Sequence, residues 1–279
     1  MTAATDRATC VACGSTGPSH LALDGLIRRC GACSFAWTAT EVETPEELYG
    51  TGYHDGEGYD DYYDPTARRF ESRRRLDWLL ATGPARTLLE IGAAAGFFVE
   101  AARGAGIEAE GIELSAGAAA YATERLGVPV ATAAFEDVAV DRQFDVVAAF
   151  HVLEHLGDPT AFLRRARGMV VPGGRLALEV PNIDAATVRR LGSAWPHIQP
   201  RYHLWHFSPA TLGRMVTDAG FEVVASDTVF SRFYGRPVGR FRHARELLVA
   251  DVAASRSLRV AHPSLGDVCR LVARAPGSP

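Results

Sequence analysis

The chain is organised around the stretch Arg86-Thr-Leu-Leu-Glu-Ile-Gly-Ala-Ala-Ala-Gly-Phe-Phe-Val-Glu100, which continues through a short helical segment to Glu108-Ala-Glu-Gly-Ile-Glu113. Apolar residues at positions 88, 89 and 91 predict a short buried strand. The small residues from Gly92 to Gly96 predict a turn in which the backbone comes close to a ligand, before a helix begins at Phe97. A second strand ends at Glu113, whose carboxylate can accept hydrogen bonds from a ribose. This succession has the spacing of a nucleotide-binding unit.

Two classes of cofactor use such a turn. A nicotinamide dinucleotide needs Gly-x-Gly-x-x-Gly, but a register that starts at Gly92 puts Ala94 and Phe97 at the second and third glycines. Class I S-adenosylmethionine-dependent methyltransferases instead carry an acid at the end of the first strand, then Gly-x-Gly-x-Gly, then a second acid that closes the second strand. The sequence resembles that pattern, with Ala94 at the middle glycine, in Glu90, Gly92, Gly96 and Glu113. The alternative is an ordinary strand-helix turn of an α/β domain.

Length and composition indicate a globular enzyme-sized chain. The 279 residues suit one medium domain plus a small appendage, and 47% hydrophobic residues can form a substantial core. The formal net charge of -4 argues against a dominant nucleic-acid surface. The N-terminal residues lack an apolar run of signal-peptide length, and no later run approaches a membrane span. We therefore expect a cytoplasmic protein that binds neither a membrane nor nucleic acid.

Four of the five cysteines form two Cys-x-x-Cys pairs, Cys10 with Cys13 and Cys30 with Cys33. Two such knuckles can supply four thiolates to one tetrahedral Zn2+, with Gly14 and Gly31 assisting the two turns. Because four protein ligands leave no position for water, the expected role of the zinc is structural. The alternative is loose or redox-active thiols, which this spacing favours less.

Residues 49–65 are rich in Tyr, Gly and Asp, a composition that discourages regular structure. Tyr63 and its neighbouring tyrosines offer ring faces with polar tips, so the segment is either a lid or a surface linker. Asp64-Pro65 then predicts the start of an amphipathic helix that ends before Gly83-Pro84. We divide the chain into a zinc ribbon (1–45), a tyrosine-rich lid or linker with its helix (46–83) and a methyltransferase domain (84–279).

Strands and helices continue to alternate after Glu113. Ser115 can cap a helix that runs to Leu126, residues 158–170 predict another helix, and Ser208-Pro209 starts a further one. Strands are expected at 128–132, 145–150, 175–180 and 221–225, and residues 266–274 resemble the seventh, antiparallel strand of the class I enzymes. The predicted fold is α/β, with a Rossmann-like seven-stranded, mostly parallel sheet whose last strand is antiparallel, plus a small N-terminal zinc ribbon.

The fourth strand leads into His151-Val-Leu-Glu-His155-Leu-Gly-Asp-Pro159. Open α/β sheets bind ligands beyond the carboxyl ends of their strands, so these side chains are expected to face the methyl group of the cofactor. With Phe144-Asp-Val-Val147 before it and Pro172-Gly-Gly174 after it, the motif resembles the ubiquinone-biosynthesis and sugar-modifying branch of class I methyltransferases. The same branch has a His-Leu-x-x-Phe-Ser segment, matched by residues 203–208.

The resemblance implies S-adenosylmethionine as the cofactor, S-adenosylhomocysteine as its product, and Zn2+ as a structural ion. The residues that it assigns to cofactor binding lie in the first turn, in the loops after the second, third and fourth strands, and in the tyrosine-rich segment. They are Glu90, Gly92, Ala94, Gly96, Glu113, Leu114, Phe135, Glu136, His151 and Tyr63.

Methyl transfer from a sulfonium is an in-line displacement, so the protein must align donor and acceptor and exclude water. A hydroxyl or an acidic carbon also needs a general base, for which histidine suits neutral pH. The candidates are His151, Glu154, His155, His203 and His206, and we prefer His155 as the base with His151 lining the cofactor. Each has a structural alternative, either as a partner of free amides at a helix start or as a packed core histidine.

The leading hypothesis is methyl transfer to O or C of a small molecule, such as a nucleotide-linked sugar or a natural-product intermediate. The order of ribbon and methyltransferase domain is similar to that of sugar C-methyltransferases, although those carry a further large C-terminal domain. The rival is a methyltransferase directed at nucleic acid or protein, or an inactive binding module, with the ribbon as the recognition element. The stretch from Arg232 to Arg245 is either a solvated face or a contact for phosphate.

Overall fold

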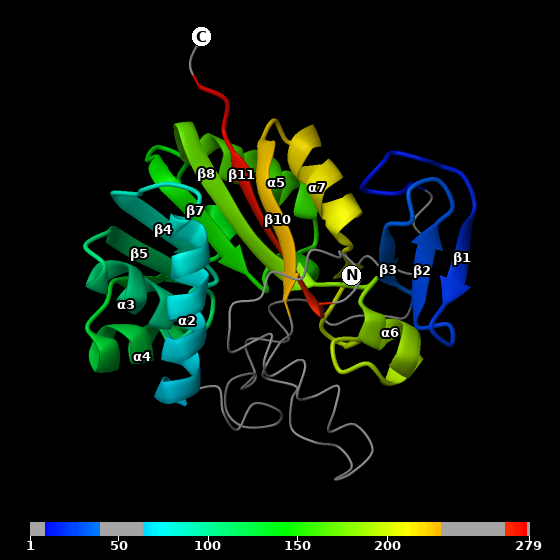
Figure 1. The fold of residues 1–279 in the computed structure, drawn as a ribbon, viewed down its shortest axis with the longest axis horizontal. Helices are drawn as coiled ribbons and strands as arrows, with labels where there is room; N and C mark the ends of the chain where they lie inside the picture. The colour runs from blue at the N-terminus through cyan, green and yellow to red at the C-terminus, as the bar shows by residue number, and fades with distance from the viewer. Residues whose placement is uncertain (1–8, 40–63, 230–265, 278–279) are drawn as a thin grey trace.

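A computed structural model describes residues 9–39, 64–229 and 266–277 (Figure 1). Three sequence predictions fall outside these ranges: the tyrosine-rich lid or linker up to residue 63, the assignment of Tyr63 to the cofactor, and the stretch from Arg232 to Arg245. Within the described ranges, no helix combines the length and the apolar character needed to cross a membrane.

The centre of the molecule is a seven-stranded sheet in the order β10-β11-β8-β7-β4-β5-β6. Five strands run parallel: β4 (Thr87–Ile91), β5 (Glu108–Glu113), β6 (Val130–Thr132), β7 (Phe144–Phe150) and β8 (Val170–Pro181). The last strand, β11 (Val268–Arg274), lies antiparallel between β8 and β10 (Glu222–Val229). The predicted fold class is thus confirmed.

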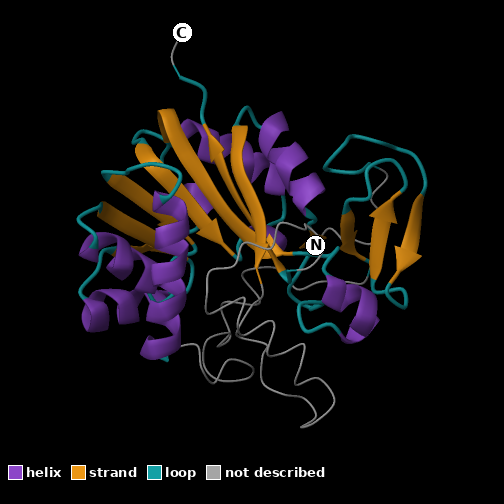
Figure 2. Ribbon diagram, in the orientation of Figure 1, coloured by secondary structure: helices purple, strands orange, loops and turns teal. Residues whose placement is uncertain are grey.

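Helices cover both faces of this sheet (Figure 2). Helices α2 (Pro65–Leu80), α3 (Phe97–Gly104) and α4 (Ala116–Tyr121) pack on one face, and α5 (Pro159–Gly168) and α7 (Pro209–Asp218) on the other. Successive strand residues point to opposite faces. Leu88 and Val146 belong to the core between the sheet and helices α2, α3 and α4, and Leu89 and Val147 belong to the core between the sheet and helices α5 and α7. Burial on both faces explains the nearly continuous apolar sequence of the central strands.

The helix starts follow the signals in the sequence. Asp64, Ser115, Asp158 and Ser208 each accept a hydrogen bond from a backbone amide in the first turn of the following helix, and Pro65, Pro159 and Pro209 occupy early helical positions. Helix α4 continues as a π-helical turn over Ala122–Leu126 and ends at Gly127 in the left-handed conformation.

Two predicted element boundaries after Glu113 differ from the structure by more than two residues. Strand β8 begins at Val170 rather than Arg175, because Val170 already pairs with Phe144, and Gly173 (φ 77°) and a bulge let the strand continue. Gly174 is needed at the same place, since a Cβ there would lie 2.9 Å from the Asp145 carbonyl oxygen. Strand β10 extends to Val229 rather than 225, because it pairs with β11 over that whole length.

The three strands of the ribbon and strand β9 form a second, four-stranded sheet in the order β1-β2-β3-β9. Strands β1 (Ser19–Ala22), β2 (Ile27–Cys30) and β3 (Ala36–Thr38) come from the N-terminal segment, whereas β9 (Trp205–His206) lies between β8 and β10 in the sequence. Strand β9 pairs antiparallel with β3, with Trp37 opposite Trp205. The short helix α6 (Ala186–Leu191) and the 3-10 turn Gly192–Ala194 lie between β8 and β9, and α6 packs beneath the ribbon (Figure 1).

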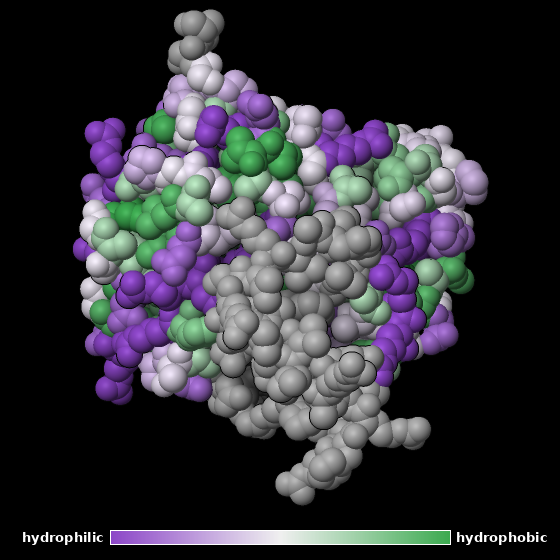
Figure 3. All heavy atoms as spheres, in the orientation of Figure 1, coloured by the Kyte–Doolittle hydropathy of each residue, from purple (hydrophilic) through white to green (hydrophobic). Residues whose placement is uncertain are grey.

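The ribbon shares a hydrophobic core with the central sheet. Phe35 is fully buried and stacks on Trp205, with ring centroids 5.8 Å apart, and meets Phe207 edge-on at 5.5 Å. Both of its partners belong to the core cluster that also holds residues of β4, β7 and β8. Arg29 adds an ion pair with Asp184 at 3.1 Å. On the face shown in Figure 3, hydrophilic residues gather over the layer of α2, α3 and α4.

Candidate active site

The turn after β4 has the geometry of a glycine-rich ligand loop. Gly92, Ala94 and Gly96 have φ values of 69°, 51° and 81°, so all three occupy the left-handed region. Glycine adopts that region freely, whereas alanine does so at a cost of roughly 1 kcal/mol. Ala94 therefore takes the conformation that the middle glycine of the class would take, and the turn forms despite the substitution.

Small residues also let three segments meet at this turn. A Cβ on Gly92 would lie 2.6 Å from Val152 Cγ2, and a Cβ on Gly111 would lie 2.5 Å from the Cβ of Ala93. Gly111 of β5 was missed by the sequence analysis. A glycine inside a strand indicates a close approach of other backbone, and that signal could have identified it.

Glu113 joins the turn after β4 to the loop after β5. Its carboxylate accepts hydrogen bonds from the amides of Ala94 and Ser115, both at 2.8 Å. Burial raises the pKa of Glu113 above its ordinary value, although these amides act in the opposite direction. Each carboxylate oxygen retains a second lone pair, so the group fits the two hydroxyls of a ribose.

Glu90 is a second buried carboxyl, at the end of β4 and 4% exposed. Its Oε2 atom has no hydrogen-bond partner in the described part of the chain. Burial raises the pKa of Glu90 well above its ordinary value, and Glu113 raises it further, whereas Arg75 lowers it. An orphaned acid at this edge fits a cationic ligand, and S-adenosylmethionine carries a sulfonium and an ammonium group.

Three further predicted cofactor residues lie in the next loops. Leu114 is 37% exposed and offers an apolar surface directly after Glu113. Phe135 and Glu136 lie in the 3-10 turn Phe135–Asp137 after β6, where the Phe135 ring is buried and lies 4.6 Å from the ring of Phe162. The ring is thus part of the core, so a ligand can meet only the backbone of Phe135 and the exposed side chain of Glu136.

The loop after β7 places His151 between two carboxylates. His151 has a φ of 57°, and its Nδ1 lies 3.2 Å from Glu154 Oε1 while its Nε2 lies 3.9 Å from Glu179 Oε2. Burial alone would lower the pKa of His151, but Glu154 and Glu179 raise it above its ordinary value. The charged form, which offers no lone pair, is therefore more favoured at His151 than in an ordinary histidine.

Glu179 itself is held by two arginines that the sequence analysis missed. Arg75 of α2 donates to it, and Arg270 of β11 lies 3.7 Å from its Oε1. Burial would raise the pKa of Glu179, but Arg75 and Arg270 lower it below its ordinary value. Arg75 also lies over the Phe150 ring, 4.7 Å from its centroid. In the sequence Arg75 is one of three consecutive arginines (73–75), and nothing there distinguishes it from the other two.

A second group consists of Glu154 and His155 from this loop and His203 from the segment that precedes β9. The two histidine rings meet edge to face with centroids 4.8 Å apart, and both are less than 9% exposed. The Nδ1 of His155 lies 3.0 Å from the Tyr202 carbonyl oxygen, and the Nδ1 of His203 lies 3.0 Å from that of His197. A carbonyl only accepts, so both Nδ1 atoms carry the proton and both Nε2 atoms present a lone pair.

This group, which we call the histidine cluster (Glu154, His155 and His203), has a marked surplus of acceptors. Glu154 is fully buried, and its Oε2 has no hydrogen-bond partner among the described residues. One ligand atom from each residue lies within 4.8 Å of the others. Burial lowers the pKa of His155 and takes that of His203 well below its ordinary value, so both stay neutral. The donor set suits either proton abstraction from an acceptor or a divalent metal ion.

His206 is separate from this cluster. Thr38 Oγ1 donates its only proton to the His203 carbonyl oxygen, so the 3.0 Å contact between Thr38 Oγ1 and His206 Nε2 must use the Nε2 proton of His206. Burial, followed by the charge of Arg29, lowers the pKa of His206 to about 3. His206 is therefore a neutral donor in the ribbon interface.

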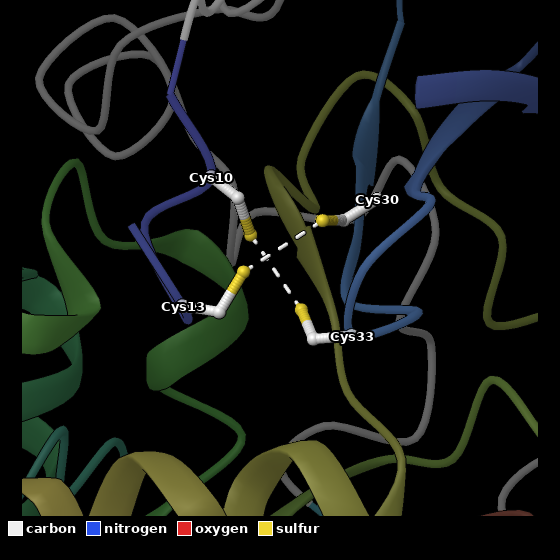
Figure 4. A group of neighbouring side chains, drawn as sticks. All are labelled: Cys10, Cys13, Cys30 and Cys33. Atoms are coloured by element: carbon white, nitrogen blue, oxygen red, sulfur yellow. Dashed lines mark hydrogen bonds between the residues drawn. The ribbon is translucent and has the colours of Figure 1, made fainter. Parts of the chain in front are cut away.

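The four cysteines point toward one centre (Figure 4). Cys10 Sγ lies 3.7 Å from Cys33 Sγ, and Cys13 Sγ lies 3.7 Å from Cys30 Sγ. A tetrahedral zinc with bonds of about 2.3 Å needs sulfur atoms about 3.8 Å apart, whereas a disulfide needs about 2.05 Å. The sulfur positions therefore fit a closed Zn2+ site. The cysteine cluster is confirmed, and zinc as its ion stays a prediction.

One detail of the knuckles differs from the prediction. Gly14 has a φ of 69° and donates to the Cys10 carbonyl, as expected, but its counterpart is Ser34, which has a φ of 63° and donates to the Cys30 carbonyl. Gly31 is required for another reason, because a Cβ there would lie 2.7 Å from the Pro18 carbonyl oxygen.

Comparisons with known proteins agree with the fold and with the resemblance to methyltransferases. A family model described as a methyltransferase domain matches residues 63–226, more than half of the chain. The chain is 28% identical over 167 residues to the ubiquinone biosynthesis O-methyltransferase of Thiobacillus denitrificans, covering 53% of this chain and 70% of that protein. It is 30% identical over 170 residues to the enzyme of the same name from Pseudomonas paraeruginosa, covering 53% and 71%.

Among solved structures, a SAM-dependent methyltransferase from Thermotoga maritima superimposes with a TM-score of 0.56 at 17% identity, over 82% of this chain and 98% of that one. At that identity the likeness shows the fold alone. The chain therefore belongs to the methyltransferase-domain family, as a class I S-adenosylmethionine-dependent methyltransferase.

Proposed function

We propose that the protein transfers a methyl group from S-adenosylmethionine to an oxygen or carbon of a small molecule, with His155 as the general base. The observation that carries this proposal is the neutral His155 imidazole in the loop after β7. Its proton is held on Nδ1 by the Tyr202 carbonyl, and its Nε2 lone pair has carboxylate and imidazole neighbours instead of a bonded donor. The names of the two O-methyltransferases above support a small-molecule oxygen as acceptor.

S-adenosylmethionine supplies an electrophilic methyl group on its sulfonium. In the proposal, Glu113 binds the ribose hydroxyls, Glu90 balances the positive charge, and the turn from Gly92 to Gly96 admits the cofactor next to the backbone. Leu114, with the backbone of Phe135 and the side chain of Glu136, lines the adenine. These roles agree with the positions of the residues, which lie at or just beyond the carboxyl ends of β4, β5 and β6.

The remaining roles belong to side chains of the loop after β7 and to His203. His155 takes the proton of the acceptor, and His203 offers a second lone pair that orients the acceptor group. His151 lines the cofactor side, and its two carboxylate neighbours, Glu154 and Glu179, fix the position of its ring. Burial of the cluster excludes water, which keeps the base neutral and the donor and acceptor aligned.

The four cysteines hold a structural zinc in this proposal, and the division into ribbon (1–45), lid or linker with helix (46–83) and methyltransferase domain (84–279) is retained. The acceptor class is a phenol, sugar or secondary-metabolite intermediate that carries a hydroxyl or an acidic C–H bond.

The test is a screen of purified, zinc-loaded protein against phenols, nucleotide-linked sugars and polyketide hydroxyls. Release of S-adenosylhomocysteine is measured together with a gain of one methylene in product mass. Methylation of one small-molecule class supports the proposal. Methylation of tRNA or of a protein extract, with affinity for nucleic acid that falls steeply with salt, would overturn it in favour of a macromolecular substrate.

A further inference from the structure

The ribbon and the loop after β7 are joined by one short segment, residues 202–206. Strand β3 of the ribbon lies on one side of this segment, through its pairing with β9, and the 3-10 turn Leu153–His155 lies on the other. Thr38, the last residue of β3, is fully buried at the junction. Its position links the zinc site to the histidine cluster.

Both sides form hydrogen bonds with peptide groups of this segment. From the ribbon, Thr38 donates its amide to the Leu204 carbonyl at 3.0 Å and its hydroxyl to the His203 carbonyl. From the loop, the Glu154 carbonyl accepts the Leu204 amide at 2.7 Å, and His155 Nδ1 donates to the Tyr202 carbonyl. A shift of β3 therefore moves the backbone that carries His203 and that fixes the proton of His155.

A packed path leads from the thiolates to the same place. Cys30 donates its amide to the Phe35 carbonyl at 2.9 Å, so the second knuckle fixes Phe35. Phe35 stacks on Trp205, and Trp205 Nε1 donates to the Leu156 carbonyl at 2.6 Å, next to His155. Hence two routes, one through hydrogen bonds of Thr38 and one through Phe35, run from the ribbon to the histidine cluster.

The cofactor residues have different supports. Glu113 is bonded to Ala94 and Ser115, which belong to the turns in front of α3 and α4. Glu90 and Glu113 lie at the ends of β4 and β5, toward the far edge of the sheet from β10. The recorded hydrogen bonds of the Glu113 side chain thus do not involve the ribbon.

We infer that the ribbon is the support of the acceptor half of the site: Thr38 is a positioning residue for His203 and His155, and the zinc knuckles keep β3 in place for it. The expected fall in kcat rests on the proposed function, whereas the expected change in the histidine cluster does not. Loss of zinc or of the Thr38 hydroxyl disturbs the histidine cluster and leaves binding of S-adenosylmethionine nearly unchanged.

The test compares Thr38→Val, which keeps the side-chain shape but removes the hydroxyl, with Thr38→Ser, which keeps it. Long-range 1H–15N spectra report the tautomers and pKa values of His155 and His203, and calorimetry reports the affinity for S-adenosylmethionine. In Thr38→Val we expect altered His203 and His155 resonances, a cofactor affinity within about threefold of wild type, and kcat lower by about 10- to 100-fold. Thr38→Ser should restore the wild-type spectra.

Thr160→Val is the matched control, because the Thr160 hydroxyl also donates to the ribbon, at the Val11 carbonyl (3.3 Å). The structure records no contact between this hydroxyl and the histidine cluster among the described residues. The variant should leave the histidine spectra unchanged. In a second arm, a chelator removes zinc from wild type while a colorimetric indicator counts released metal. Histidine resonances that stay unchanged in Thr38→Val with full zinc content, or after zinc release, overturn the inference. Wild-type protein without any methyl transfer would refute the proposed function alone.

Discussion

The Glu154 carboxylate lies within hydrogen-bond distance of His151 and close to His155, yet the pKa values of the two histidines are shifted in opposite directions. The Nδ1 of His151 lies 3.2 Å from Glu154 Oε1, and a second carboxylate lies near its Nε2, so its pKa is raised. His155 is dominated by burial, and its pKa is lowered. Two histidines four residues apart thus have pKa values shifted in opposite directions, and the one with the lowered pKa is the better candidate for a neutral base.

The first prediction concerns the pH dependence of catalysis. A general base must be neutral, so activity is present above its pKa and is lost as pH falls through it. Because the pKa of His155 is lowered, the acidic limb of kcat/KM should lie below about 6.5, the ordinary value for histidine. A limb above that value would assign the base to His151, whose pKa is raised. The measurement is a pH profile with the acceptor found by screening.

The second prediction separates the base from its support. His155→Asn retains a donor for the Tyr202 carbonyl but removes the Nε2 lone pair, so kcat should fall about 10²- to 10⁴-fold while the affinity for cofactor stays the same. His20→Asn, on the exposed face of β1, is the control and should match wild type. Retention of more than a tenth of wild-type kcat in His155→Asn would remove His155 from the mechanism.

The third prediction concerns the strained turn. Ala94→Gly relieves a left-handed alanine (φ 51°), so the free energy of unfolding in urea should rise by up to about 1 kcal/mol. Ala95, its neighbour, is 2% exposed and lacks a positive φ, so Ala95→Gly should lower that free energy by about 1 kcal/mol. Equal destabilisation by both substitutions would contradict the backbone assignment.

The fourth prediction links cofactor binding to protons. The pKa of Glu90 is raised in the free protein, and a bound cation favours the ionised carboxylate, so binding should release protons. The affinity for S-adenosylmethionine should accordingly rise with pH until Glu90 ionises in the free protein. Calorimetry in two buffers of different ionisation enthalpy measures this release, and Glu90→Gln should abolish it. Proton uptake by wild type would show that Glu90 is not the group concerned.

Local patterns predicted the fold well, because they depend on neighbours in sequence. The caps at Asp64, Ser115 and Ser208 and the apolar run of β7 identify elements without any tertiary information. The boundary of β8 was wrong because a bulge beside Gly173 extends the pairing beyond the apolar run. The two-residue strand β9 could not be predicted, since only its partner β3, more than 160 residues away, makes it a strand.

The site divides in the same way. The turn from Gly92 to Gly96, Glu113 and the four cysteines are visible as motifs in the sequence, because their chemistry requires fixed spacings. The sequence does not show how His151, His155 and His206 differ in their hydrogen-bond partners. That difference depends on Glu179, Tyr202 and Thr38, which come from distant segments. Arg75 was missed for the same reason, since only the buried Glu179 gives it a role.

The central claim is that S-adenosylmethionine binds at the carboxyl edge of the sheet through Glu113. Its most direct test is a calorimetric titration of zinc-loaded wild type, Glu113→Gln and Glu108→Ala, the last being an exposed acid on the same strand. Wild type and Glu108→Ala should bind with equal affinity, and Glu113→Gln at least tenfold more weakly while remaining folded by circular dichroism. Absence of binding to wild type, or equal binding to Glu113→Gln, would contradict the account.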